Sequence, residues 1–95
     1  MKIPKKLKIG GHWIKIKKVN NRMKQHGDGK MGTSFMWNNT IWLDTDAAIQ
    51  QQESTLIHEI LEMIKMMNDL SFDHKELCVL ETALYQVLND NKLLK

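Results

Sequence analysis

The chain has 95 residues, 42% of them hydrophobic and 26% charged, which is typical of one globular domain with one modest core. No apolar run approaches the roughly 20 residues of a membrane span, and no apolar segment typical of a signal peptide follows the basic residues at the start. The single cysteine, Cys78, excludes an internal disulfide, so we expect a cytoplasmic protein in a reducing compartment.

The formal net charge of +3 is unevenly distributed along the chain. Residues 1–30 contain ten basic residues and one acidic residue, whereas residues 31–95 contain four lysines and ten acidic residues. A basic half can attract an anionic partner such as nucleic acid. No nucleic-acid-binding motif accompanies the lysines. We therefore interpret them as a solvated β surface that discourages edge pairing, with only weak, non-specific and strongly salt-dependent contact with nucleic acid.

The first predicted element is a β-hairpin formed by residues 3–9 and 12–19. The two segments alternate apolar and basic side chains and are joined at Gly10-Gly11, a strong hairpin signal. One face of this hairpin should therefore be apolar and the other basic. We expect the large side chain of Trp13 to lie in the core.

A second hairpin is predicted for residues 33–37 and 40–44. Asn38-Asn39 forms its turn, because asparagine tolerates left-handed backbone geometry. The polar residues 20–31 that precede it are predicted to be a loop. Trp37 is expected in the core, and the strand over residues 40–44 is a candidate to pair with an extended peptide.

Two helices are predicted in the second half. The first begins at Thr45 or Asp46, both good N-cap residues, and ends near Asn68. The second begins with the capping box formed by Asp73 and Glu76. A stripe of leucines and a valine along the second helix is expected to be buried. Its members are Leu77, Leu80, Leu84, Val87 and Leu88.

These elements predict an α+β fold in one domain, residues 1–95. A small antiparallel sheet of two hairpins would occupy residues 1–45. Two helices would occupy residues 46–95, antiparallel because the turn that joins them is short.

The first helix contains the segment His58-Glu59-Ile60-Leu61-Glu62. His58 and Glu62 are four residues apart, so they lie one above the other and can converge on one metal ion. Glu59 is the next residue round the helix, where a general base acting on a water at that metal would lie. This is the logic of the HExxH metalloprotease helix with glutamate as the second ligand, an HExxE motif. The alternative is a surface helix without metal. The apolar run on both sides favours the metal site, because unpartnered charges are costly to bury there.

Further candidate ligands lie on the second helix. His74, Cys78, Glu81 and Tyr85 fall on one side of it, at spacings of four, three and four. In an antiparallel pair of helices, both His74 and Glu81 can reach the His58–Glu62 site. Cys78 is a weaker candidate, and we interpret it as an inert thiol.

The order of hairpins, HExxE helix and last helix ending at residues 83–91 resembles small phage and prophage proteins. Those proteins are related to minimal, gluzincin-like zincin-type zinc metallopeptidases. The resemblance covers nearly the whole chain and implies a zincin-like fold, one zinc ion and hydrolysis of a peptide or protein substrate. A bacterial host's cytoplasm would be the location, with no membrane partner.

Glu62 departs from the family pattern, which carries a second histidine at this position. A histidine from the later helix would restore the His₂Glu ligand set. We therefore expect His58, Glu62 and His74 to hold zinc, with Glu59 as the catalytic base. Glu81 is either a group that orients a ligand histidine or the alternative third ligand.

A different class of function stays open, namely a non-catalytic binding protein on a degenerate zincin scaffold. Its partner would be a host protein, or nucleic acid bound through the lysine face. Zinc content and turnover are the observations that distinguish the two hypotheses.

Overall fold

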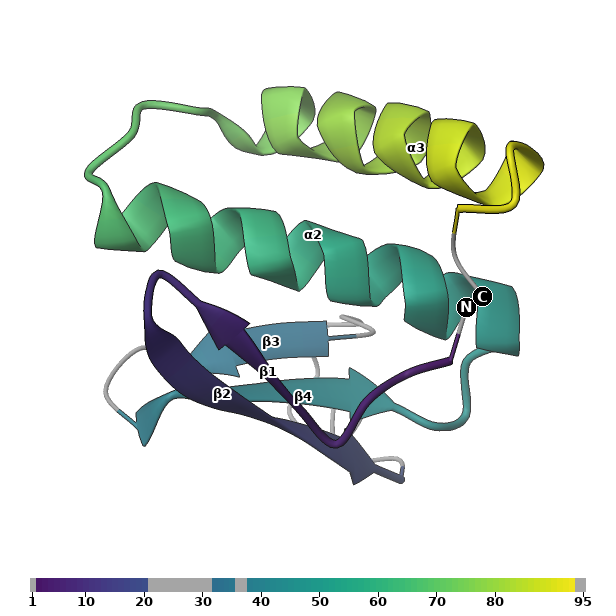
Figure 1. Ribbon diagram of the computed structural model, residues 1–95, viewed down its shortest axis with the longest axis horizontal. Helices are drawn as coiled ribbons and strands as arrows, with labels where there is room; N and C mark the ends of the chain where they lie inside the picture. The colour runs from purple at the N-terminus through teal and green to yellow at the C-terminus, as the bar shows by residue number, and fades with distance from the viewer. Residues whose placement is uncertain (1, 21–31, 36–37, 94–95) are drawn as a thin grey trace.

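The computed structural model describes residues 2–20, 32–35 and 38–93, arranged as a four-stranded sheet and two helices (Figure 1). The α+β fold class predicted from the sequence is confirmed. Most of the predicted loop, including His26, lies outside the described residues, as does Trp37. The elements are β1 (Lys6–Ile9), β2 (His12–Val19), β3 (Gly32–Phe35), β4 (Thr40–Asp44), α2 (Ile49–Met67) and α3 (His74–Asp90).

The strand order of the sheet is β1-β2-β4-β3. The β1/β2 and β3/β4 pairs are antiparallel, as two hairpins require, but β2 and β4 are parallel, with Ile16 opposite Ile41. The expectation of a wholly antiparallel sheet is therefore wrong at the junction of the hairpins. The physical reason is burial, because β4 carries the fully buried Ile41 and Leu43 and occupies the centre, where both of its edges are paired.

This order also changes which strands can pair with another chain. β4 has a neighbour on each side, so the expectation that residues 40–44 pair with an extended peptide is wrong. Among the strands that the structure describes, β1 and β3 are the edges.

The core lies between one face of the sheet and α2. Trp13 is not part of it and is 56% exposed. The expectation that Trp13 is buried is wrong because successive side chains on β2 point to opposite faces, and Ile14 and Ile16 take the covered face. The buried apolar side chains of this core are Ile9, Ile14, Ile16, Ile41, Leu43, Leu56 and Met63.

The two helices begin in different ways. The N-cap of α2 is Ala48, without a side-chain hydrogen bond, so the expected cap at Thr45 or Asp46 is wrong. Those two residues are instead held in a turn after β4, where the Thr45 amide donates to Val19 O and the Asp46 amide to Asp44 Oδ1. At α3, the capping box is confirmed, since Asp73 accepts from the Glu76 amide and Glu76 accepts from the Asp73 amide.

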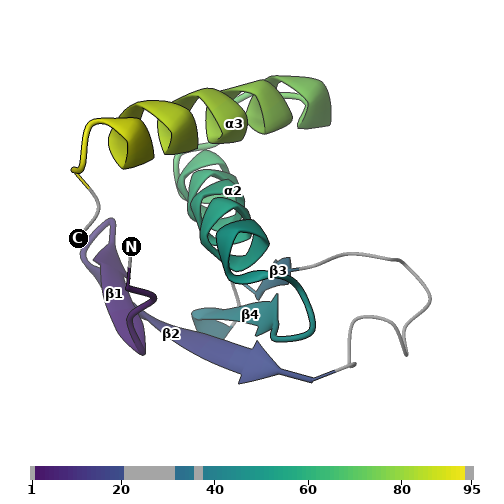
Figure 2. The same ribbon diagram turned by 90° about the vertical axis from the view of Figure 1, so that its right-hand side faces the viewer.

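α2 lies between the sheet and α3, and the two helices run in opposite directions (Figure 1). Figure 2 shows that α3 crosses over α2 and lies away from the sheet. The expected buried stripe of α3 is therefore confirmed at Leu77, which is fully buried, and in part at Leu88, which is half-buried. It is wrong at the other three members, because among the described residues α3 is covered only on the side that it turns toward α2. Leu80, Leu84 and Val87 are 36%, 39% and 46% exposed. No helix of the described residues is long and apolar enough to cross a membrane.

Candidate functional site between helices α2 and α3

A chain of three polar side chains joins the two helices. His58 Nδ1 lies 3.0 Å from Glu81 Oε1, and the Ser54 hydroxyl donates to Glu81 Oε2. Ser54 and His58 are one turn apart on α2, so a single carboxylate of α3 spans both. The side chains of His58 and Glu81 are only 14% and 21% exposed, so this contact is largely shielded from water.

The contact determines which nitrogen of His58 carries a proton. An ionised carboxylate only accepts hydrogen bonds, so His58 Nδ1 must donate to Glu81. In a neutral imidazole, the other nitrogen, Nε2, then keeps its lone pair. His58 is thereby prepared to act as a ligand or a base through Nε2.

His74 lies beside His58 at the start of α3. The ring centroids are 5.4 Å apart and the ring planes are inclined by 68°. Two imidazoles on one tetrahedral zinc ion would have centroids about 5 Å apart, given Zn–N distances of about 2.0–2.1 Å. The separation of these two rings therefore fits a pair of zinc ligands. His74 Nε2 also lies 3.4 Å from Cys78 Sγ, one turn further along α3.

Glu62 lies one turn after His58 and is half-buried. Within residues 2–20, 32–35 and 38–93, no three His, Cys, Asp or Glu side chains converge closely enough to hold a metal ion. The structure thus places His58 in contact with Glu81 and beside His74, but it does not place His74, Glu81 or Glu62 with His58 as a completed set of ligands.

Glu59 is turned toward the sheet, whereas His58 is turned toward α3. Glu59 is only 7% exposed. Its Cγ would lie 3.4 Å from a Cβ at Gly32, the first residue of the edge strand β3. Consecutive helix residues are about 100° apart around the axis, which explains why these neighbours face different elements. Glu59 is therefore a buried carboxylate beside a sheet edge.

A second polar contact joins the helices one turn away. The Tyr85 hydroxyl donates to Glu53 Oε1 at 2.6 Å. Three effects together raise the pKa of Tyr85 to about 12: this hydrogen bond, which is the largest, then burial, and then the negative charge of Glu53. Ionising Tyr85 would remove the donor and place two negative charges together.

Neither Ser54 nor Glu53 is predicted from the sequence to be a site residue. A signal existed for Ser54, which lies four residues before His58 and therefore on the same face of α2. Tyr85 lies four residues after Glu81 in the same way. Across the helix interface, Glu81 contacts both Ser54 and His58, whereas Tyr85 contacts Glu53, the residue before Ser54.

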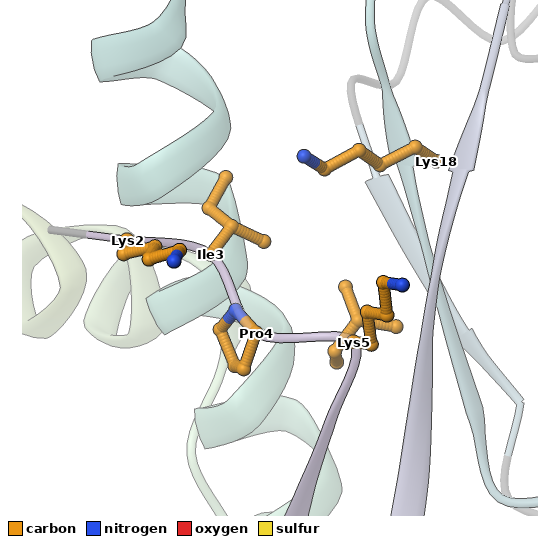
Figure 3. A pocket seen from close by; sticks show the side chains of 6 residues that line it. Lys2, Ile3, Pro4, Lys5 and Lys18 are labelled. Carbon is orange, nitrogen blue, oxygen red and sulfur yellow. The ribbon is translucent and has the colours of Figure 1, made fainter.

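The structure also contains a basic pocket of about 770 Å³ that shares no residue with this site. Lys18 of β2 reaches across it toward the N-terminal segment (Figure 3). The pocket is lined by Lys2, Ile3, Pro4, Lys5, Ile16 and Lys18.

Comparison with protein-family models, with curated proteins and with solved structures found no match to this chain. The polar contacts between α2 and α3, together with the buried carboxylate of Glu59, are therefore the features of this chain that bear on its function.

Proposed function

We propose that this protein is a zinc-dependent metallohydrolase, acting on peptide bonds, of the zincin-like kind carried by phages and prophages. The observation that carries the proposal is the pairing of His58 with Glu81, beside a second imidazole at a separation that suits one metal ion. A histidine with a purely structural role needs neither a carboxylate partner nor a neighbouring imidazole. A metal-binding histidine, by contrast, almost always donates its second ring N–H to an orienting group.

The ligands in this proposal are His58, His74 and Glu62. The contacts of Glu81 support an orienting role rather than a ligand role, because its two oxygens already accept from His58 and Ser54. Glu62 would complete the set by a change of side-chain rotamer, since Cβ atoms four residues apart on a helix are about 5–6 Å from each other. His₂Glu is a ligand set of catalytic zinc sites.

The chemistry divides between the metal and the chain. When bound, zinc supplies a Lewis acid that polarises a carbonyl group and acidifies a water molecule. In this proposal Glu59 accepts the proton of that water and delivers it to the leaving amine. Because Glu59 is turned toward the sheet and His58 toward α3, this role requires the Glu59 side chain to turn toward the His58 side of α2. Because Glu59 lies beside Gly32, a peptide paired with the edge strand β3 would pass close to this carboxylate. We place this activity in the cytoplasm of a bacterial host.

Metal analysis of protein purified without chelators tests the proposal. We expect about one zinc ion per chain, and none in His58→Ala. Asp69→Asn, in the turn after α2, is a matched control that should keep the metal. Wild-type protein without zinc after incubation with the ion, or His58→Ala with unchanged zinc, would show that the site is not the one proposed.

A further inference from the structure

The face of the sheet turned away from the helices has an unusual combination of side chains. Both helices lie on the other side of the sheet (Figure 2). Along β2, Ile14 and Ile16 are buried on the helix side, so the residues between them point outward. We call the surface formed by Lys6, Lys8, Trp13, Lys15 and Lys17 the outer sheet face; all five side chains are exposed.

Trp13 is the aromatic residue of the outer sheet face and lies near the hairpin end of β2. Its indole is 56% exposed, although burying such a ring would be strongly favourable. Lys8 is opposite Trp13 in the β1/β2 register, and the Nζ atoms of Lys6 and Lys8 lie 4.7 and 5.6 Å from the ring centroid. Two lysine ammonium groups thus lie near this indole, where cation–π attraction holds them.

The charge of this face is also uniform. Lys15 is opposite Lys6 across the β1/β2 pair, and Lys17 follows on the same side of β2. The outer sheet face thus combines four lysines with one aromatic ring, and β1 and β2 contain no acidic residue. A polyanion that also carries planar rings is the partner whose chemistry matches both features.

We infer that the outer sheet face binds single-stranded nucleic acid, with a base stacked on Trp13 and phosphates bound by the four lysines. Single strands expose the faces of their bases, and stacking on an aromatic residue in a basic groove holds them without regard to sequence. Aromatic residues on a β-sheet surface stack bases in this way in known RNA-binding modules. Duplexes keep their bases stacked internally, so Trp13 would gain nothing from them. This inference is independent of the metal site.

The test is binding of a fluorescently labelled oligodeoxythymidine, followed by anisotropy at several salt concentrations. Four phosphate contacts predict a slope of about −3 for the logarithm of the binding constant against the logarithm of salt concentration. Trp13→Ala should weaken binding on the order of tenfold, and Trp13→Phe should weaken it less because it keeps a ring. Since Trp13 is exposed, both variants should retain the circular dichroism spectrum of the wild type.

Matched controls locate the surface. The double variant Lys15→Glu/Lys17→Glu should abolish measurable binding, whereas Lys75→Glu/Lys92→Glu, with the same change in net charge at the two ends of α3, should preserve most of it. Lys5→Glu/Lys18→Glu removes two cations from the basic pocket (Figure 3) and should act like the α3 control.

Four results would overturn the inference. The first is equal affinity for a duplex of the same length, and the second is unchanged oligonucleotide binding by Trp13→Ala. The third is a loss of oligonucleotide affinity in either control variant as large as the loss in Lys15→Glu/Lys17→Glu. The fourth is binding to phosphatidylserine vesicles with no binding to the oligonucleotide, which would assign the face to an anionic membrane surface instead.

Discussion

His58 Nδ1 lies 3.0 Å from Glu81 Oε1, and the same carboxylate accepts a hydrogen bond from Ser54 through its other oxygen. One residue of α3 therefore sets the orientation of an imidazole on α2. An orienting carboxylate increases the basicity of a ligand histidine and holds its ring in place.

The first prediction concerns this carboxylate. Glu81→Gln should lower zinc affinity by about 10- to 100-fold, the usual effect of losing an orienting partner, while the metal content at saturating zinc stays near one. Ser54→Ala should act in the same direction but more weakly, because it removes one hydrogen bond to Glu81 and leaves the contact with His58. Competition with a chromogenic chelator measures both affinities. If Ser54→Ala were the more damaging change, or if Glu81→Gln bound zinc as the wild type does, the orienting role would be refuted.

The second prediction separates two glutamates on one turn of α2. Glu59→Gln should keep zinc and lower peptide hydrolysis by a factor on the order of 10² to 10⁴, since it removes a positioned base. Glu62→Gln should lose zinc, since it removes a ligand. Zinc content and peptide cleavage are measured for both variants.

The pair of results distinguishes three cases. A surface helix without metal gives no difference between the variants, and a degenerate scaffold gives a difference in zinc with no hydrolysis in either protein. Equal zinc content in Glu59→Gln and Glu62→Gln would refute the ligand assignment.

The third prediction concerns the hydrogen bond between Tyr85 and Glu53. Tyr85→Phe should lower the free energy of unfolding at pH 7 by about 1–2 kcal/mol, since it removes a hydrogen bond to a buried carboxylate. The pKa of Tyr85 is raised in the folded protein to about 12, so the neutral form is the one that folding favours. The contribution of this hydrogen bond to the free energy of unfolding is therefore present below about pH 10 and is lost as the pH rises toward 12.

Urea unfolding of wild type and Tyr85→Phe at pH 7 and pH 11 measures the pH dependence of this contribution. The difference in free energy of unfolding between the two proteins should be smaller at pH 11 than at pH 7. The comparison with Tyr85→Phe isolates Tyr85 from the lysines that titrate in the same range. A difference that grows between pH 7 and pH 11 would contradict the assignment.

The fourth prediction tests the packing of β3 on α2. A Cβ at Gly32 would lie 2.5 Å from Thr55 Cγ2 and 3.2 Å from the backbone oxygen of Trp42, so Gly32→Ala should destabilise the protein by about 1–3 kcal/mol. Thr55→Ser removes only Cγ2. In the Thr55→Ser background, Gly32→Ala should therefore cost clearly less than in the wild type. Additive losses of unfolding free energy in the double variant would show that these two residues do not meet.

The sequence by itself determined the local features of this protein. The capping box of α3 follows from Asp73 and Glu76 being three residues apart, and the first hairpin follows from Gly10-Gly11 between alternating segments. The positive φ of Asn39 agrees with the turn predicted there. The spacing of four between Glu81 and Tyr85 placed both on one side of a helix. Each feature depends on residues a few positions apart, whose geometry the backbone sets directly.

Only the tertiary structure decided which surfaces meet. It placed β4 between β2 and β3, and within the part of the chain that the structure describes it set both helices on one face of the sheet, so that Trp13 on the other face is exposed. It also set α3 across α2, which exposes Leu84 and brings Glu81 to His58. These outcomes depend on how much apolar area each packing arrangement buries over the whole chain, and periodicity within one segment carries no information about that total.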